Sequence, residues 1–180
     1  MKLMQLAALA GGVWVGVAGA VQVCNSNMAL TRPDSRYETV AGTTPAGSEV
    51  RDRVTGLIWQ RCVQGMAWSG STCTGTATTH NSWMTALELA RTATPTTAAT
   101  VTLWRLPNKT ELFSLPERAC ASPAINATWF PADPGGWAWS SSPVSGSVDG
   151  AWYVLFSDGG GYTGGSKGFA GQVRLVRSSQ

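Results

Sequence analysis

The sequence predicts an α+β fold, in which two short helices and a small, mainly antiparallel sheet are joined by long loops. Two helical patterns lie in the middle of the chain, and strand patterns follow one another from Trp137 to the C-terminus. The chain has 180 residues, of which 43% are hydrophobic, so it can bury one sizeable core. Both observations favour a single α+β domain.

The first predicted helix follows Asn81 or Ser82, either of which can cap its N-terminus. Trp83, Leu87 and Ala90 recur at the i, i+4 and i+7 spacing of one helical face. The Thr-, Ala- and Pro-rich tract at 92–100 has no such periodicity and is predicted to be a loop.

A second, shorter helix is predicted after Pro107, a residue that stops any helix running into it. Trp104 and Leu106 alternate as at the end of a strand. Asn108 can cap the helix, and Glu111 completes a spacing like that of a capping box.

Strands are predicted on both sides of these helices. A short one lies around Arg36–Val40, and Leu57-Ile58-Trp59 forms a compact apolar run after a turn that Asp52 can start. The C-terminal strands are predicted at 137–141, 152–157 and 171–177, with a hairpin turn at 157–159. The middle one is apolar on both faces, so we expect it to be central in the sheet.

The N-terminus has the pattern of a secretory signal. Lys2 precedes an apolar run from Leu3 to Val17, and Ala18-Gly19-Ala20 offers a cleavage site; an uncleaved anchor is the alternative. We divide the chain into a signal peptide (1–20), an N-terminal arm (21–50) and the domain (51–180). No later segment is apolar enough to span a membrane, so we expect a protein exported to the periplasm or the cell surface.

Four cysteines follow the signal, and an even number in an exported chain predicts two disulfides. Of the three pairings we favour Cys62 with Cys73, which closes the loop between them, and Cys24 with Cys120, which ties the N-terminus to the middle of the fold. A zinc site is disfavoured, because the chain has no C-x-x-C pair and a single histidine, His80. With 13 basic and 10 acidic residues, the charge is too small for a nucleic-acid footprint.

The chain resembles the bacterial DUF1566 family, typified by the C-terminal domain of the Legionella collagen-like adhesin. The matching segments run in order from about Cys24 to Arg177: TGLIWQRC (55–62), TLWRLPNKTELFSL (102–115), WAWSSSP (137–143), AWYVLFSDG (151–159) and VRLVR (173–177). The resemblance implies a C-type-lectin-like fold and an adhesin-like role. A more distant likeness links it to the formylglycine-generating enzyme and sulfatase-modifying group.

The residues argue against catalysis. The formylglycine-generating group uses two reactive cysteines near its final strands, whereas no cysteine follows Cys120 here. A serine hydrolase would need a nucleophile beside a base, but His80 lies in a polar stretch that looks exposed. The carboxylates are scattered along the chain. We therefore expect a non-catalytic binding module, with an uncharacterised envelope enzyme as one alternative.

We expect the ligand to bind at the C-terminal loops 144–150 and 158–168, held together at one end of the sheet. Tyr162, in the Gly-rich loop with Lys167, is the best candidate for an exposed aromatic residue. Most of the other aromatic residues from Trp137 to Tyr153 are expected in the core, and a minority could stack on sugar rings. The partner is a glycan or a cell-surface protein.

Two further ligand chemistries follow from charged residues. Asp149 and Asp158 could hold Ca²⁺ with backbone carbonyls, although the E-P-N and W-N-D motifs of calcium-dependent lectins are absent, and we predict no obligatory cofactor. A basic patch for sulfated or acidic glycans would comprise Arg105, Lys167, Arg174 and Arg177. The alternative is that the three arginines are partly buried and have carboxylate or carbonyl partners. A structural subunit of a surface or pilus-like assembly, hence an oligomer, is the remaining alternative.

Overall fold

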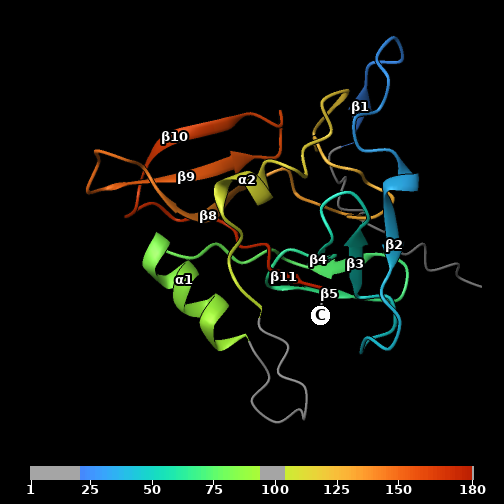
Figure 1. The fold of residues 1–180 in the computed structure, drawn as a ribbon, viewed down its shortest axis with the longest axis horizontal. Helices are drawn as coiled ribbons and strands as arrows, with labels where there is room; N and C mark the ends of the chain where they lie inside the picture. The colour runs from blue at the N-terminus through green and yellow to red at the C-terminus, as the bar shows by residue number, and fades with distance from the viewer. Residues whose placement is uncertain (1–20, 94–103, 180) are drawn as a thin grey trace, which may run out of the picture.

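A computed structural model describes residues 21–93 and 104–179. The predicted signal peptide and most of the predicted loop at 92–100 lie outside these residues. The described chain forms two principal antiparallel sheets with two α-helices (Figure 1), which confirms the α+β class. The sequence led us to expect one small sheet, whereas strands from both ends of the chain form the second.

The first sheet has three strands in the order β10-β9-β8. β8 spans Trp137–Pro143, β9 Gly150–Leu155 and β10 Gly161–Ser166. The predicted central strand is therefore central, and the Ser157-Asp158-Gly159 turn leads into β10 as a hairpin. Helix α2 (Lys109–Leu112) packs against β8 and β9.

β10 corrects one prediction, because we expected a loop over 158–168. Its sequence, GYTGGS, has no apolar alternation that would signal a strand. Pairing with β9 through the hairpin is sufficient to order it, and a register shift lies between Tyr162 and Gly165.

The second sheet has four strands in the order β11-β4-β3-β2. β2 (Tyr37–Thr39) and β4 (Leu57–Gln60) confirm two predicted strands, and a 3-10 turn, η1 (Asp34–Arg36), precedes β2. β3 (Glu49–Asp52) was not expected as a strand, since two of its inward positions are Val50 and a charged Asp52.

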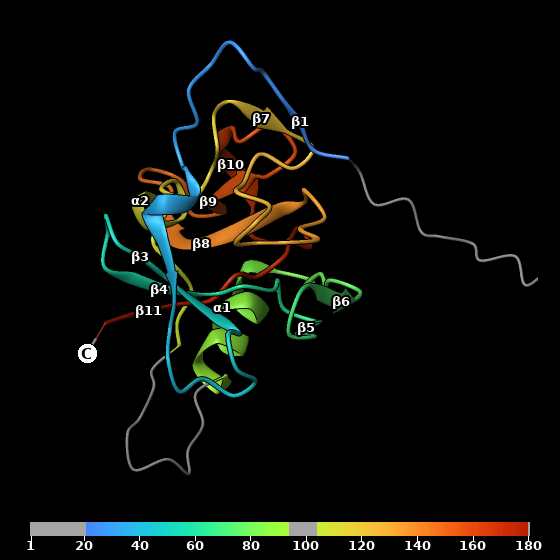
Figure 2. The same cartoon turned by 90° about the vertical axis from the view of Figure 1, so that its right-hand side faces the viewer.

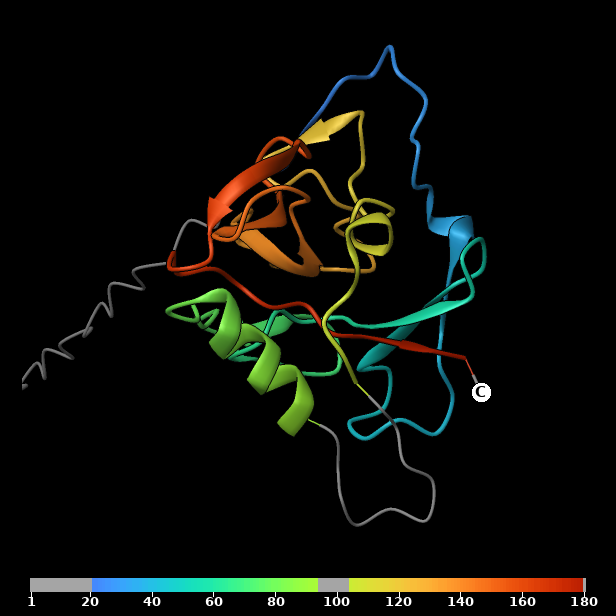
Figure 3. The ribbon, with the colours of Figure 1, turned by 60° about the vertical axis from the view of Figure 1, so that its left-hand side comes forward.

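The last strand is shorter than predicted. β11 spans Val176–Ser178 and pairs with β4 rather than with the C-terminal sheet. The preceding residues cross between the two sheets: Gln172 exchanges backbone hydrogen bonds with β8, and Val176 does so with Arg105. Figure 3 shows this segment running from one sheet to the other, past α1. The predicted strand at Trp104–Leu106 is reduced to the single bridge at Arg105.

Two small strand pairs carry the disulfides, and both favoured pairings are confirmed. β1 (Val23–Cys24) pairs with β7 (Cys120–Ala121), and Cys24 is bonded to Cys120. β5 (Met66–Trp68) pairs with β6 (Cys73–Gly75), and Cys73 is bonded to Cys62. Figure 2 shows the first pair at the top of the molecule and the second at its lower right.

Both predicted helix caps are present. Helix α1 (Trp83–Thr92) has Ser82 as its N-cap in a reciprocal capping box with Thr85. α2 has Asn108 and Glu111 in the same arrangement. Each box satisfies backbone N–H groups that would otherwise have no partner in the first turn.

The core consists of two clusters of buried side chains. One fills the space between the four-stranded sheet and α2 and includes Trp59, Leu112 and Phe130. The other joins α1 to the three-stranded sheet and includes Ala86, Ala90 and Trp139. Neither cluster of buried residues includes 144–149 or 157–160, which lie in the loops at the two ends of β9.

Candidate functional site

The predicted ligand loops do not meet at one end of the sheet. The 144–150 loop precedes β9, whereas Asp158 lies in the turn after it, at the opposite end of the strand. β10 then carries the chain back, so that Lys167 returns to the 144–150 loop, where its backbone N–H donates to the Asp149 carbonyl over 2.7 Å. Asp149 and Lys167 are brought together, and Asp158 is not.

This separation bears on the calcium hypothesis. Asp149 and Asp158 are both exposed, but they lie at opposite ends of β9. The Asp158 carboxylate accepts a hydrogen bond from the Gly160 N–H at 2.7 Å, as in a turn. Among the described residues, no three acidic, histidine or cysteine side chains converge as metal ligands would.

Tyr162 lies in β10, opposite Tyr153 of β9, rather than in a loop. Its side chain lies outside the part of the chain that the structure describes. Its predicted role in the ligand site therefore stays a prediction.

Arg174 is buried, with 1% of its side chain exposed, so it is not a surface residue. It forms an ion pair with Asp133 and donates to the carbonyl oxygens of Gln60 and Arg61 over 3.1 and 2.8 Å. Its guanidinium also lies over the Phe130 ring, 4.9 Å from the centroid. The alternative interpretation, a buried arginine with carboxylate and carbonyl partners, describes it correctly.

The other members of the predicted basic patch also have partners. Arg105 pairs with Glu111, and Arg177 pairs with Glu49, at N–O distances of 2.6 and 2.7 Å. Lys167 donates to the Val148 carbonyl over 2.7 Å. The charges of both arginines are therefore compensated by carboxylates, whereas Lys167 is hydrogen-bonded to a neutral carbonyl, so the four residues do not form a free basic patch for an anion.

A cluster of partly exposed apolar side chains lies on the three-stranded sheet beyond the part that α1 covers. We call it the aromatic face, and it consists of Trp137, Tyr153, Leu155 and Phe169. β8 and β9 supply the first three from neighbouring positions, since Trp137 lies opposite Leu155. Phe169 follows β10 and is 59% exposed.

The aromatic face surrounds a shallow pocket of about 290 Å³. The Trp137 ring meets Tyr153 edge to face at a centroid distance of 5.1 Å and Phe169 at 6.5 Å. Gly165 forms part of the wall, and a Cβ there would lie 2.8 Å from the Tyr153 ring. A side chain at this position would therefore displace Tyr153.

Sequence reasoning missed Phe169 as a site residue. Its signal is a large apolar side chain isolated in a stretch of Gly, Ser and Lys, where a core position is not expected. Trp137 and Tyr153 could be identified as aromatic strand residues, but the sequence does not reveal that α1 leaves them partly exposed.

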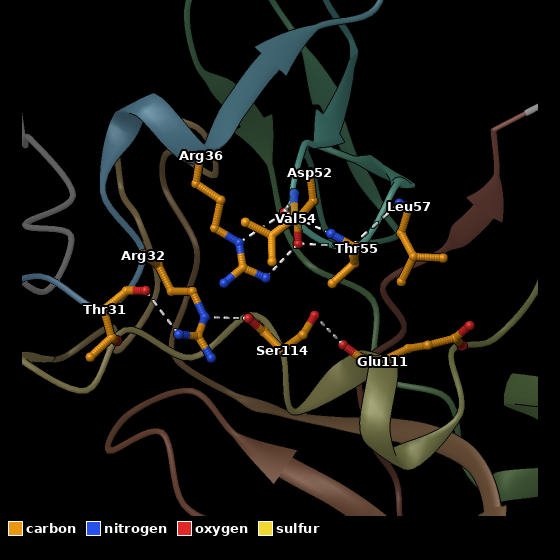
Figure 4. Close-up of polar contacts among 9 residues, drawn as sticks. All are labelled: Thr31, Arg32, Arg36, Asp52, Val54, Thr55, Leu57, Glu111 and Ser114. Carbon is orange, nitrogen blue, oxygen red and sulfur yellow. Dashed lines mark hydrogen bonds and ion pairs between the residues drawn. The ribbon is translucent and has the colours of Figure 1, made fainter.

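Hydrogen bonds and an ion pair connect the N-terminal arm to β3 of the second sheet. Arg36 donates to both carboxylate oxygens of Asp52, over 2.8 and 2.5 Å (Figure 4). Asp52 also accepts from the Val54 N–H and the Thr55 hydroxyl. Burial alone would raise the pKa of Asp52, but these hydrogen bonds hold it below its ordinary value.

Asp52→Asn is expected to lower the free energy of unfolding at pH 7 by about 1–3 kcal/mol, because it removes charge-assisted hydrogen bonds from Arg36. The folded-state pKa of Asp52 lies below its unfolded value. Its contribution is therefore complete above the unfolded pKa, near 4, and is lost as the pH falls through the folded value. Urea unfolding of wild type and variant at pH 7 measures the loss of stability, and the same comparison at pH 3 measures how much of that loss disappears when Asp52 is protonated.

Equal losses at the two pH values would contradict a role for the ionised carboxylate. Glu38→Gln is the matched control, because Glu38 makes its ion pairs with Arg51 and Arg53 at the surface. It should change stability little at either pH.

Glu117 also binds the N-terminal arm through hydrogen bonds to its carboxylate. Its buried carboxylate accepts from the backbone N–H groups of Thr31, Arg32 and Ala119. Burial would raise its pKa, and these hydrogen bonds lower it. Close by, Arg32 donates to the Ser114 carbonyl (Figure 4). The carboxylates with lowered pKa values are thus engaged in structural contacts.

His80 differs from its expected exposure, since it is half-buried. Its backbone exchanges two hydrogen bonds with Gly171, and its Nε2 has no partner among the described residues. Burial lowers its pKa.

Comparison with known protein families gives a match for this chain. The model of the Lcl C-terminal domain family matches residues 48–177, which include β3, both helices and the aromatic face. No curated protein and no solved structure matches the chain significantly. No helix within 21–93 or 104–179 is long and apolar enough to cross a membrane.

Proposed function

The chain belongs to the Lcl C-terminal domain family, and from this premise we propose that it binds glycans at the cell surface as an adhesin-like module, through the aromatic face. The observation that carries the proposal is the cluster of partly exposed aromatic rings around a 290 Å³ pocket. Solvent-exposed apolar clusters of this kind mark binding surfaces. The apolar C–H side of a sugar ring stacks on such rings.

The neighbouring loop extends this surface. Phe169 follows Lys167 by two residues, and Lys167 is hydrogen-bonded to the Asp149 carbonyl. The 144–150 loop therefore lies next to the aromatic face, and its exposed Asp149 can accept hydrogen bonds from sugar hydroxyls. This assignment retains Asp149 of the predicted site and adds Phe169 and Trp137.

The proposed mode of recognition depends on stacking more than on charge. Each arginine of the predicted basic patch has a carboxylate partner. We therefore expect glycan binding that changes little with ionic strength, since charges in partly buried pairs are screened much less than exposed charges. This argument disfavours sulfation as the main determinant of recognition.

We further propose that the module is exported and non-catalytic. Two disulfides favour an oxidising compartment, either the periplasm or the cell surface. The lowered pKa values of Asp52 and Glu117 suit ionised structural carboxylates rather than general acids. The C-type-lectin-like fold implied by the family resemblance remains part of this proposal.

A second candidate function is a structural subunit of a surface assembly. β10 forms one edge of its sheet and carries no charged residue, so its open edge could pair with a strand of another protein. Large, stable complexes that form without glycan would favour this alternative.

Phe169→Ala tests the glycan proposal. We expect about tenfold weaker binding on a glycan array that includes neutral and sulfated polysaccharides, because the most exposed ring of the aromatic face is lost. The array is run at two salt concentrations, and with and without calcium. Val54→Ala is the matched control, since Val54 is 73% exposed in the turn between β3 and β4.

Binding that is selective but equal in wild type and Phe169→Ala would place the site elsewhere. No binding to any glycan would contradict the proposal and favour a protein partner.

A further inference from the structure

Another pocket in the described chain shares no lining residue with the aromatic face and lies over β3, β4 and β5. It is a groove of about 430 Å³, and we call it the Gln60 groove. Its lining includes Ser48, Glu49, Gln60, Met66, Trp68 and Trp104. The volume falls within the range of roughly 300–1,000 Å³ that small-ligand sites occupy.

The groove presents hydrogen-bonding groups that are not used within the described residues. Glu49 and Gln60 lie directly opposite each other on β3 and β4. Both hydrogen bonds from Arg177 go to Oε2 of Glu49, which leaves Oε1 to accept another. Gln60 Oε1 accepts from Gln64, whereas Gln60 Nε2 has no partner in this part of the chain. The Ser48 hydroxyl, which has no side-chain hydrogen bond within 21–93 or 104–179, is a third such group in the lining.

Trp68 forms a fixed aromatic wall of the groove. Its indole N–H donates to the Ala46 carbonyl over 3.0 Å, which sets the orientation of the ring. The Arg61 guanidinium lies 4.6 Å from the ring centroid and supports the indole by a cation–π contact. A ligand that stacks on Trp68 therefore meets a side chain that is already ordered.

The charges in the groove favour a neutral ligand. Glu49 is paired with Arg177, whose guanidinium lies 5.5 Å from the Trp104 ring centroid. An anion would meet the Glu49 carboxylate, and no unpaired cation lines the groove: Arg61, which has no carboxylate partner among the described residues, contacts the Trp68 ring but is not part of the lining. A cation would compete with Arg177 for Glu49. Each would lose free energy that a neutral ligand does not lose.

The backbone around the groove disfavours an extended peptide. β3 is paired with β2 and β4, and β4 is paired with β3 and β11. Neither of these two strands has a free edge to which a peptide could add, and only β5, which is paired on one side with β6, has an unpaired edge at the groove. Acceptors, donors and an ordered indole suit a ring with several hydroxyl groups, each of which both donates and accepts.

We propose that the Gln60 groove is a second binding site, which takes a neutral saccharide: its ring stacks on Trp68, and its hydroxyls bond to Gln60 Nε2 and Glu49 Oε1. This site is separate from the aromatic face. The two sites would allow one domain to engage two positions on a glycan chain, which raises apparent affinity.

The test is an NMR titration of the oxidised chain, without its predicted signal segment, with cellotetraose, maltotetraose and tetragalacturonic acid. At least one neutral probe should bind with a Kd of about 0.1–1 mM and shift the Gln60 amide and Trp68 indole signals. At the groove, followed by the Gln60 amide and Trp68 indole signals, Gln60→Leu and Trp68→Ala should each weaken binding about tenfold. Trp68→Phe should retain most of the groove binding, and Phe169→Ala should retain all of it. The acidic probe should bind at least about tenfold more weakly.

Four results would overturn the proposal: no binding of either neutral probe, tighter binding of the acidic probe, unchanged affinity in Gln60→Leu, or shifts confined to Trp137 and its neighbours. If Trp68→Ala does not fold, the affinities of Gln60→Leu and Trp68→Phe are compared with that of the wild type instead. Loss of binding in Phe169→Ala alone would support the aromatic face and reject the groove, so the two proposals fail separately.

Discussion

Asp133→Ala is expected to lower the free energy of unfolding by about 3–5 kcal/mol, which is the usual result of removing one partner of a buried ion pair. The side chains of Asp133 and Arg174 are each 1% exposed. Arg174 lies over the rings of Phe130 and Phe156 and has no other carboxylate partner among the described residues. The substitution would leave its guanidinium charge buried with only neutral carbonyl partners. Denaturant unfolding at pH 7 measures the loss.

A second variant separates charge from geometry. Arg174 donates to the Gln60 and Arg61 carbonyls as well as to Asp133, and lysine cannot reproduce this planar arrangement. Arg174→Lys should therefore also be strongly destabilised, although it keeps the positive charge.

The exposed pair of Glu88 and Arg91 on α1 supplies the control. Both side chains are more than half exposed, so Glu88→Ala should leave stability unchanged within error. If Asp133→Ala were as mild as Glu88→Ala, the charge of Arg174 would have to be reaching solvent, and its burial would be contradicted.

The parts of the fold that depend on local sequence could be predicted. The sequence predicts Asn81 or Ser82 as the cap of α1, and the spacing of Asn108 and Glu111 predicts their capping box. The order of apolar residues in β9 predicts that both of its faces are covered. β10 could not be predicted, because its order comes from pairing with β9 and its own sequence is rich in glycine.

The candidate site was predicted less well, for a physical reason. Whether Arg174 is a ligand residue or a core residue depends on Asp133, forty-one positions away in sequence. Trp137 is only partly buried against the cluster that joins α1 to the three-stranded sheet, and that cluster combines residues from several elements. Sequence periodicity describes the neighbours along one element, whereas these contacts join separate elements.

Removal of the Cys24–Cys120 disulfide is expected to have the other large effect on stability. In the chain-entropy account, a cross-link restricts the unfolded chain more when it closes a longer loop. These two cysteines are 96 residues apart, whereas Cys62 and Cys73 are 11 apart. We expect the Cys24→Ser/Cys120→Ser double variant to lose about 4–5 kcal/mol and the Cys62→Ser/Cys73→Ser variant about 3.

The comparison between the two double variants is the sharper measurement. Each variant removes one disulfide by the same two Cys→Ser substitutions, so the difference in stability loss reports on the position of the disulfide. Each is unfolded with denaturant at pH 7 without reductant, and hydrogen exchange reports where protection is lost. The Cys24 variant should lose protection first in β1 and β7, which form a separate two-stranded sheet, while the Glu117 carboxylate still accepts hydrogen bonds from Thr31 and Arg32. A larger loss in the Cys62 variant would show that native contacts around β5 and β6, rather than the entropy of the unfolded chain, set the contribution of these disulfides.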